Sequence, residues 1–200
     1  MYLDLKNRWA IVSGANRGIG LEICKLFIEL GNTNIIALVR NKNQKDLENL
    51  KLIAEKNSVS LILIEFSLDE KSIDIAVAKI KSLKLPISIL INNAGVSQGS
   101  LFQLTKIETL RDLTEKNYLM QIYLTQKLAR VLIKYSPSSI INMSSISSYF
   151  GSNGFLAYGS SKAALRYSTK VLASELGSNG IRVNSISPGV TLTEMANNMD

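Results

Sequence analysis

Short apolar runs alternate along the chain with longer stretches in which apolar residues recur every three or four positions. The run RWAIVSG (8–14) leads into a glycine, and the next stretch (19–31) repeats apolar residues at helical spacing until Gly31. The alternation continues to about residue 187. It predicts six strands, at 8–13, 34–40, 59–65, 87–92, 138–143 and 181–187. It also predicts helices at 19–31, 45–56, 70–83 and 157–176, and a helical region, continuous or interrupted, over about 105–134.

The predicted strands are apolar at nearly every position. Such runs are typical of strands that are buried on both faces, as parallel strands are. Strict alternation of strands and helices favours a parallel sheet with helices on both sides, a doubly wound α/β fold. The chain has no internal linker and no low-complexity segment. We therefore expect residues 1–200 to form a single domain.

Composition agrees with a globular protein, at 46% hydrophobic and 20% charged residues. No segment approaches the run of about 18 apolar residues that crosses a bilayer. The start, MYLDLKNRWAIVSG, lacks the features of a secretory signal. The one cysteine, Cys24, lies in the apolar stripe of the first helix and is expected in the core. These features favour a cytoplasmic protein that does not enter a membrane.

The chain contains no histidine, so acid–base chemistry would fall to Tyr, Lys, Asp, Glu or Cys, and we expect no metal site. The formal net charge is +7. This excess is compatible with an acidic protein partner or a phosphorylated ligand. The basic residues are scattered, and neither a basic run nor an aromatic-lined basic stripe is present, so we do not expect nucleic-acid binding.

The turn SGANRGIG (13–20) joins the first strand to the first helix. A Rossmann unit places the pyrophosphate of a dinucleotide at this position, against the free N–H groups of the helix N-terminus. The spacing is looser than G-x-G-x-x-G, and a purely structural glycine turn is the alternative. The residues that we predict to hold the cofactor here are Gly14, Asn16, Arg17, Gly18, Ile19 and Gly20.

The end of the second strand indicates which dinucleotide is bound. NAD-binding domains place an acidic residue there, whereas NADP enzymes place an arginine nearby. The strand ends ALVRN, with Arg40, and no acidic residue lies between Leu30 and Lys45. Arg40 and Arg17 would suit a 2′-phosphate, because a guanidinium binds phosphate bidentately. We predict NADP(H) in preference to NAD(H), with two solvated surface arginines as the alternative.

The segment AYGSSKAA (157–164) places a tyrosine and a lysine four residues apart. On a helix, Tyr158 and Lys162 would lie on one face. Surface helices carry many such pairs, so the spacing alone does not indicate catalysis.

Several short motifs in order make the chain resemble the short-chain dehydrogenase/reductase family over essentially all of its length. SGANRGIG is similar to the family's TGxxxGxG turn, with Ser13 in place of threonine, and INNAG (91–95) matches its NNAG motif. Ser145 lies 13 positions before Tyr158, which is the family's spacing. The remaining matches are Asn117 in EKNYLMQ, the YxxxK pair Tyr158 and Lys162, and the PGxxxT segment in SPGVTLT (187–193).

The resemblance implies a catalytic set of Asn117, Ser145, Tyr158 and Lys162. Tyrosine has an ordinary pKa near 10, and a nearby cation lowers it. We expect Lys162 to act in this way, with Tyr158 as general acid in reduction and Ser145 as hydrogen-bond donor to the substrate oxygen. By resemblance, Lys162 also binds the nicotinamide ribose, and Asn117 holds a water that links Lys162 to solvent. An ordinary polar residue in a helix is the alternative for Asn117.

The resemblance extends the cofactor site beyond the glycine turn. Asn93 is implied to lie against the cofactor ribose, although it could simply satisfy a turn. The implied cofactor contacts also include Ala94, Gly95, Tyr158, Lys162, Pro188, Gly189 and Thr193.

Two departures from the family pattern stand out. The family usually has an aspartate after the third strand, where this chain has Phe66 or Ser67. Family members commonly run to about 250 residues, so the last strand and a helix are expected to be absent here. The chain is then either a fragment or a natural short form.

The closest similarity within the family is to 3-oxoacyl-acyl-carrier-protein reductases and related carbonyl reductases. Arg130 falls where those reductases place one basic residue for the carrier protein, while Asn179 replaces a second. We expect NADPH-dependent reduction of a small carbonyl substrate, with a 3-oxoacyl thioester as the leading candidate, by a homo-oligomer. The alternative is a non-catalytic dinucleotide-binding chain, or a subunit that assembles with a full-length partner through helices near 112–134 and 157–176.

Overall fold

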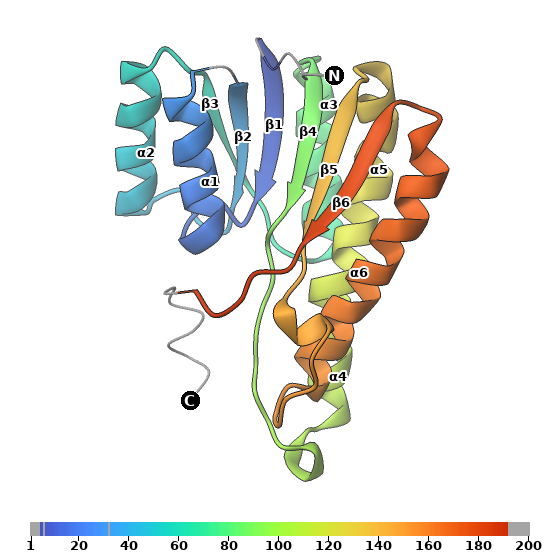
Figure 1. Ribbon diagram of the computed structural model, residues 1–200. Helices are drawn as coiled ribbons and strands as arrows, with labels where there is room; N and C mark the ends of the chain where they lie inside the picture. Colours follow the sequence, from blue (N-terminus) through green and yellow to red (C-terminus); the bar gives the residue numbers. More distant parts are fainter. Residues whose placement is uncertain (1–4, 6, 32, 192–200) are drawn as a thin grey trace.

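The computed structural model describes residues 5, 7–31 and 33–191. In this part of the chain six parallel strands form one sheet in the order β3-β2-β1-β4-β5-β6 (Figure 1). The strands are β1 (Arg8–Ser13), β2 (Thr33–Val39), β3 (Leu61–Glu65), β4 (Ile87–Asn92), β5 (Ser138–Met143) and β6 (Ile181–Ile186). The doubly wound parallel sheet that the sequence predicts is confirmed.

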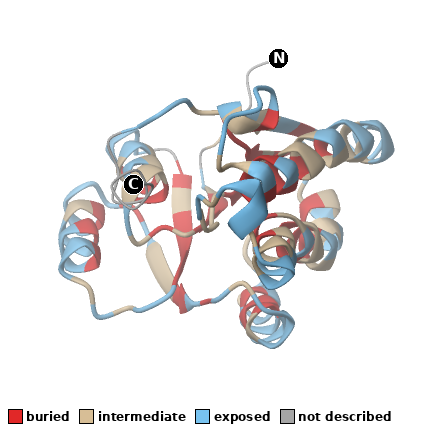
Figure 2. Cartoon of the chain, turned by 90° about the horizontal axis from the view of Figure 1, so that it is seen from below, coloured by how far each residue is buried: buried red, intermediate tan, exposed pale blue. Residues whose placement is uncertain are grey.

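Helices cover both faces of the sheet, as Figure 2 shows from below. On one face α1 (Gly18–Glu29) and α2 (Lys45–Lys56) enclose a core that includes Val12, Ile35 and Leu47. On the other face α3 (Glu70–Ser82), α5 (Met120–Lys134) and α6 (Leu156–Gly177) pack over a second core. The shorter elements are α4 (Ile107–Thr114) and single 3₁₀ turns at Phe102–Leu104 and Ile146–Ser148.

The helical region predicted over about 105–134 is interrupted. Between α4 and α5 lies a π-helical turn, Glu115–Leu119, whose one buried residue is Asn117. Such turns insert an extra residue and redirect the side chains on that turn, and they are frequent at functional sites. The turn therefore marks Asn117 as a residue whose direction the fold controls.

The strand order places the loops that matter at one edge of the sheet. From β1 the chain runs outward to β3 and then returns to β4, which pairs with β1 on its other side. At such a switch point the loops after the two strands diverge and leave a crevice. All six strands end at the same edge, the lower edge in Figure 1, where the loops after β1, β4, β5 and β6 meet.

Candidate active site

The glycine turn after β1 is shaped by positions that exclude a side chain. Gly14 has a φ of +66° and Gly18 a φ of +52°, in the left-handed region that favours glycine. A Cβ on Gly20 would collide with the carbonyl oxygen of Gly14 and would lie 2.5 Å from Nδ2 of Asn93. The backbone thus lies closer to its neighbours here than any other residue would allow.

The N-terminus of α1 opens directly behind this turn. The helix begins at Gly18 with Arg17 as its N-cap, no side chain caps it, and its first turn holds no acidic residue. Backbone N–H groups in this setting attract phosphate. The close-packed turn and this helix end therefore fit the pyrophosphate of a dinucleotide.

Ser13 and Asn93 lock the loop after β1 to the loop after β4. The hydroxyl of Ser13 accepts hydrogen bonds from the N–H groups of Asn93 and Ala94, each at 3.0 Å. The Asn93 carboxamide donates to the carbonyls of Ser13 and Gly14, at 3.0 and 3.2 Å. In the structure Asn93 thus satisfies a turn, and its contact with a cofactor ribose stays a prediction.

The backbone beside Asn93 is held from the helical side. Gln121 on α5 donates from Nε2 to the carbonyl of Ala94 at 2.7 Å. A Cβ on Gly95 would lie 3.0 Å from Oδ1 of Asn117 and 3.3 Å from Nζ of Lys162. The predicted cofactor residues Ala94 and Gly95 therefore adjoin two of the predicted catalytic residues.

Asn117 is completely buried, and its carboxamide is bonded on both sides. Oδ1 accepts from the N–H of Val96 at 2.8 Å, and Nδ2 donates to the Val96 carbonyl at 2.9 Å and to the Ser161 hydroxyl at 3.1 Å. Only an oxygen can accept from the Val96 N–H, so the orientation of the amide is fixed by its partners.

The two residues of the YxxxK pair are buried together near the start of α6. Tyr158 is 8% exposed and Lys162 is 5% exposed. The Lys162 ammonium donates to the carbonyl of Met143, at the end of β5, at 2.8 Å, and it lies 6.0 Å from the centroid of the Tyr158 ring. Ser145 follows β5, is largely buried, and shares a hydrogen bond with Tyr158. The structure thus brings all four predicted catalytic residues to the carboxyl edge of the sheet.

The acidity of Tyr158 differs from the expectation. Burial raises the pKa of Tyr158 above its ordinary value, and the hydrogen bond with Ser145 only partly opposes this effect. The expected lowering by Lys162 is therefore wrong for the structure. The reason is geometric, since the ammonium is directed at the Met143 carbonyl rather than at the ring. Burial also lowers the pKa of Lys162 to about 8.

The buried ammonium predicts how stability depends on pH. The pKa of Lys162 is about 8 in the folded protein against an ordinary value of 10.5, so between these values the unfolded chain binds more protons. This side chain therefore makes stability rise with pH from about 8 to 10.5. We expect Lys162→Met to abolish this contribution. The free energy of unfolding of the variant minus that of the parent should then fall by on the order of 3 kcal/mol across this range.

Urea titrations of both proteins at a series of pH values provide the measurement. Tyr158 and Cys24, whose pKa values burial raises, titrate in both proteins and cancel in the difference. A difference that stays constant with pH would contradict the burial of a charged Lys162.

The remaining predicted residues lie at the rim of this edge. Arg40 is exposed directly after β2, and Arg17 is exposed at the start of α1. The Pro188 carbonyl accepts from the N–H of Ile146 at 3.0 Å, and Gly189 is exposed beside it. Thr193 lies outside the described residues.

Two residues singled out in the sequence have structural roles. Phe66 is buried in the core, whereas Ser67 is exposed and donates to Asp69, the N-cap of α3, so neither side chain supplies an acidic group after β3. Cys24 is fully buried as predicted, and burial raises the pKa of its thiol to about 12.

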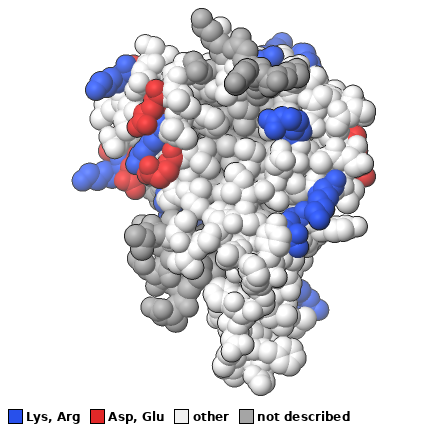
Figure 3. Space-filling view, in the orientation of Figure 1, with Lys and Arg blue, Asp and Glu red and all other residues white. Residues whose placement is uncertain are grey.

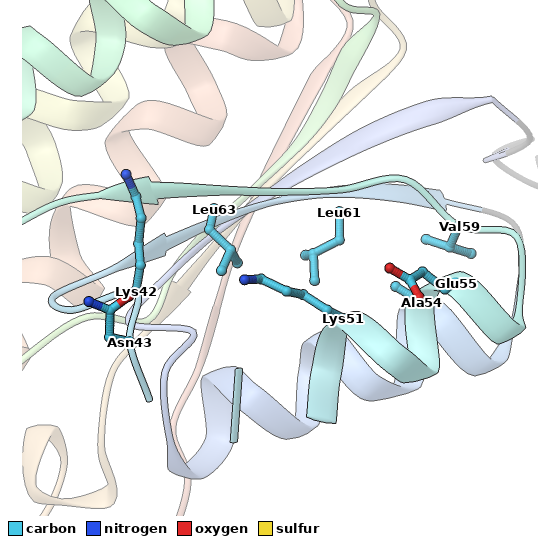
Figure 4. A pocket seen from close by; sticks show the side chains of 8 residues that line it. All are labelled: Lys42, Asn43, Lys51, Ala54, Glu55, Val59, Leu61 and Leu63. Carbon is cyan, nitrogen blue, oxygen red and sulfur yellow. The ribbon is translucent and has the colours of Figure 1, made fainter. Parts of the chain in front are cut away.

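A hollow of about 420 Å³ lies elsewhere, between α2 and the edge strand β3 (Figure 4). Its walls combine apolar side chains such as Leu61 and Leu63 with Lys42, Lys51 and Glu55. None of the predicted site residues lines it. Within the described part of the chain no group of three or more potential ligand side chains could hold a metal ion, and no helix is long and apolar enough to cross a membrane.

The parallel sheet, its strand order and the glycine turn define the class of this protein, a Rossmann-type dinucleotide-binding fold. The model of the short chain dehydrogenase family matches residues 8–200. The chain belongs to this family of oxidoreductases, which bind a nicotinamide dinucleotide.

Individual relatives agree with this assignment. The 3alpha-hydroxysteroid dehydrogenase of Mediterraneibacter gnavus is 33% identical over 196 residues, and the 3-oxoacyl-(acyl-carrier-protein) reductase FabG of Aquifex aeolicus is 32% identical over 196. Each alignment covers 98% of this chain and 78% of the relative. The NADPH-bound carbonyl reductase from chicken fatty liver superposes with a TM-score of 0.83 at 27% identity, covering 96% of this chain and 79% of the other.

Sequence reasoning missed several residues that build the site. The carbonyl of Met143 holds Lys162, and the hydroxyl of Ser161 joins Asn117 to α6. Every residue has a backbone carbonyl, so the sequence does not indicate which one accepts this hydrogen bond. Ser161 had one available signal. It lies three residues after Tyr158, which places it on the same face of α6, and that face is buried.

Proposed function

We propose that the protein reduces a carbonyl to an alcohol with NADPH, and that Tyr158 donates the proton. The observation that carries the proposal is the arrangement of Tyr158, Ser145, Lys162 and Asn117 beside a glycine turn that fits a pyrophosphate. A bound nicotinamide cofactor would supply the hydride and, when oxidised, a positive charge.

The side chains of the site would handle the oxygen of the substrate. As the carbonyl is reduced, negative charge develops on its oxygen. The Ser145 hydroxyl would stabilise that charge by a hydrogen bond, and the Tyr158 hydroxyl would donate its proton to it. A tyrosine hydroxyl carries its proton at neutral pH, so Tyr158 is available as an acid, although burial raises its pKa and makes it a weaker one. Lys162, whose ammonium is directed at the Met143 carbonyl rather than at the Tyr158 ring, would bind the nicotinamide ribose.

The preference for NADP(H) is proposed from Arg40 and Arg17. Both side chains are exposed at the carboxyl edge of the sheet, on the loops after β2 and β1. A 2′-phosphate accepts charge-assisted hydrogen bonds from guanidinium groups, whereas a ribose 2′-OH is better served by an acidic side chain.

Arg40→Asp is expected to weaken NADPH binding by roughly 10- to 100-fold, because a charge-assisted contact is replaced by repulsion. NADH binding should be unchanged or tighter. The measurement is the dissociation constant of each nucleotide, by fluorescence titration at fixed ionic strength. Lys56→Ala, at the far end of α2, removes an exposed positive charge away from the loop and serves as control. Equal weakening of both nucleotides by Arg40→Asp would argue against a role in 2′-phosphate recognition.

A 3-oxoacyl thioester is the substrate that we favour. The Aquifex aeolicus relative is a reductase of this class, and the loops that flank the site present large exposed apolar side chains that an acyl chain could contact. These are Leu101, Phe102 and Leu104 after β4 and Tyr149 and Phe150 after β5. A hydrogen bond of 2.9 Å from the Ser100 N–H to the Gly154 carbonyl joins the two loops. In the view of Figure 3, the lower projection of the molecule carries few charged side chains.

The test is oxidation of NADPH in the presence of an acetoacetyl thioester and a panel of ketones and aldehydes. We expect turnover with at least one carbonyl and the fastest turnover with the thioester. NADPH binding without turnover of any carbonyl would favour a dinucleotide-binding chain that is not itself a reductase. A protein that binds neither NADPH nor NADH would overturn the proposal.

A further inference from the structure

Helix α6 carries two buried hydroxyls in parallel settings. The Ser161 hydroxyl accepts from Nδ2 of Asn117 at 3.1 Å and donates to the Tyr158 carbonyl at 2.7 Å. Two turns further on, the Thr169 hydroxyl accepts from Nδ2 of Asn142 at 2.9 Å and donates to the Leu165 carbonyl at 2.8 Å. Each hydroxyl thus joins a buried asparagine to the backbone of the same helix. Only the first of them touches the candidate active site.

Ser161 completes the set of partners that holds Asn117 in one orientation. A carboxamide has two N–H donors, and in Asn117 one goes to the Val96 carbonyl and the other to Ser161. Asn117 is fully buried, so without Ser161 one of its two donors would lose its protein partner. The side chain would then have to rotate or move to satisfy that donor.

The position of Asn117 matters because it is adjacent to Lys162. Oδ1 of Asn117 and Nζ of Lys162 both lie within 3.3 Å of the point that a Cβ on Gly95 would occupy. Ser161 directly precedes Lys162, and its hydroxyl is bonded to the carbonyl of Tyr158. One side chain therefore links the π-helical turn that carries Asn117 to the turn of α6 that carries Tyr158 and Lys162.

We propose that Ser161 is a positioning residue. Its hydroxyl holds Asn117 in place beside Lys162. The position of Asn117 in turn sets the rate at which a proton reaches Tyr158 after each turnover. This inference rests on the proposed reductase function. It assigns no contact with substrate or cofactor to Ser161.

The kinetic test compares Ser161→Ala with two matched variants in turnover of the carbonyl that the parent reduces. Thr169→Val removes the parallel buried hydroxyl, and Ser160→Ala removes the exposed neighbouring hydroxyl. We expect Ser161→Ala to lower kcat by about 10- to 100-fold with KM nearly unchanged, because a misplaced group slows the step that it serves. The solvent deuterium isotope effect on kcat should increase. Thr169→Val and Ser160→Ala should keep the parent's kcat and isotope effect.

An equal loss of kcat in Ser161→Ala and Thr169→Val would show that Ser161 has only a structural role, and it would overturn the proposal.

A second measurement does not depend on activity. The Val96 N–H donates to Asn117, so its protection from hydrogen exchange reports whether Asn117 is held. Relative to amides that exchange through global unfolding, the Val96 amide should exchange at least about 10-fold faster in Ser161→Ala than in the parent or in Thr169→Val. If no carbonyl is reduced, the proposed function fails while this measurement still decides the role of Ser161. A Val96 amide that exchanges alike in all three proteins would refute it.

Discussion

Replacing Tyr158 by phenylalanine is expected to lower kcat by about 100- to 10,000-fold, while NADPH still binds with nearly the parent's affinity. The variant lacks the hydroxyl that donates the proton, and Ser145 alone can only stabilise the developing charge by a hydrogen bond. The ring itself remains, so its packing in the buried position and its edge-on contact with Phe155, at 6.2 Å between centroids, should persist.

The chain offers a close control for this experiment. Tyr167 lies on the same helix but is 69% exposed, so Tyr167→Phe removes a hydroxyl of the same kind from solvent. Steady-state oxidation of NADPH by the parent and both variants gives the comparison. If Tyr158→Phe retained the parent's kcat, the proton would have to come from another group, and the assignment of Tyr158 would fail.

Gly20→Ala is expected to abolish measurable NADPH binding and to destabilise the protein by roughly 1–3 kcal/mol. The new Cβ would collide with the Gly14 carbonyl oxygen and approach Nδ2 of Asn93 to 2.5 Å. Neither neighbour can move freely, since the first is backbone and the second donates to the carbonyls of Ser13 and Gly14. The turn must therefore open, which displaces the N–H groups at the start of α1.

Gly177→Ala provides the matched glycine substitution. A Cβ at Gly177, the last residue of α6, would meet no atom within 4 Å, so thermal stability and NADPH binding should stay close to those of the parent. The measurements are thermal unfolding and fluorescence titration with NADPH. Parental affinity in Gly20→Ala would show that the close approach at Gly20 is not needed for the cofactor.

Much of the fold is predictable from apolar periodicity. Where a predicted strand boundary is wrong, the cause is local. The run 8–13 matches β1 because residues 9–13 are all buried and a glycine with positive φ, Gly14, follows directly. The strand predicted from residue 59 begins at Leu61 instead. Val59 is apolar and buried, yet its N–H donates to the Ala54 carbonyl at the end of α2, after Ser58 has turned with a φ of +54°. A buried apolar residue that closes a helix looks like the first residue of a strand.

For the candidate site, the identity of the residues is predictable from the sequence, but their orientation and acidity are not. Spacing and motif order predict Asn117, Ser145, Tyr158 and Lys162, and the structure gathers them at one edge, although their chemical roles remain predictions. The motifs do not report where a buried charge points. The direction of Lys162 toward the Met143 carbonyl and the raised pKa of Tyr158 both depend on packing that is set by distant segments.

The burial of Cys24 has a practical consequence. Its thiol is fully enclosed under α1, and its pKa of about 12 leaves almost no thiolate at neutral pH, so an alkylating reagent can react only when the helix separates from the sheet. The same helix supports the glycine turn. The rate of alkylation of this single cysteine therefore measures how often α1, which supports the dinucleotide site, separates from the sheet. The measurement requires no label and no catalytic activity.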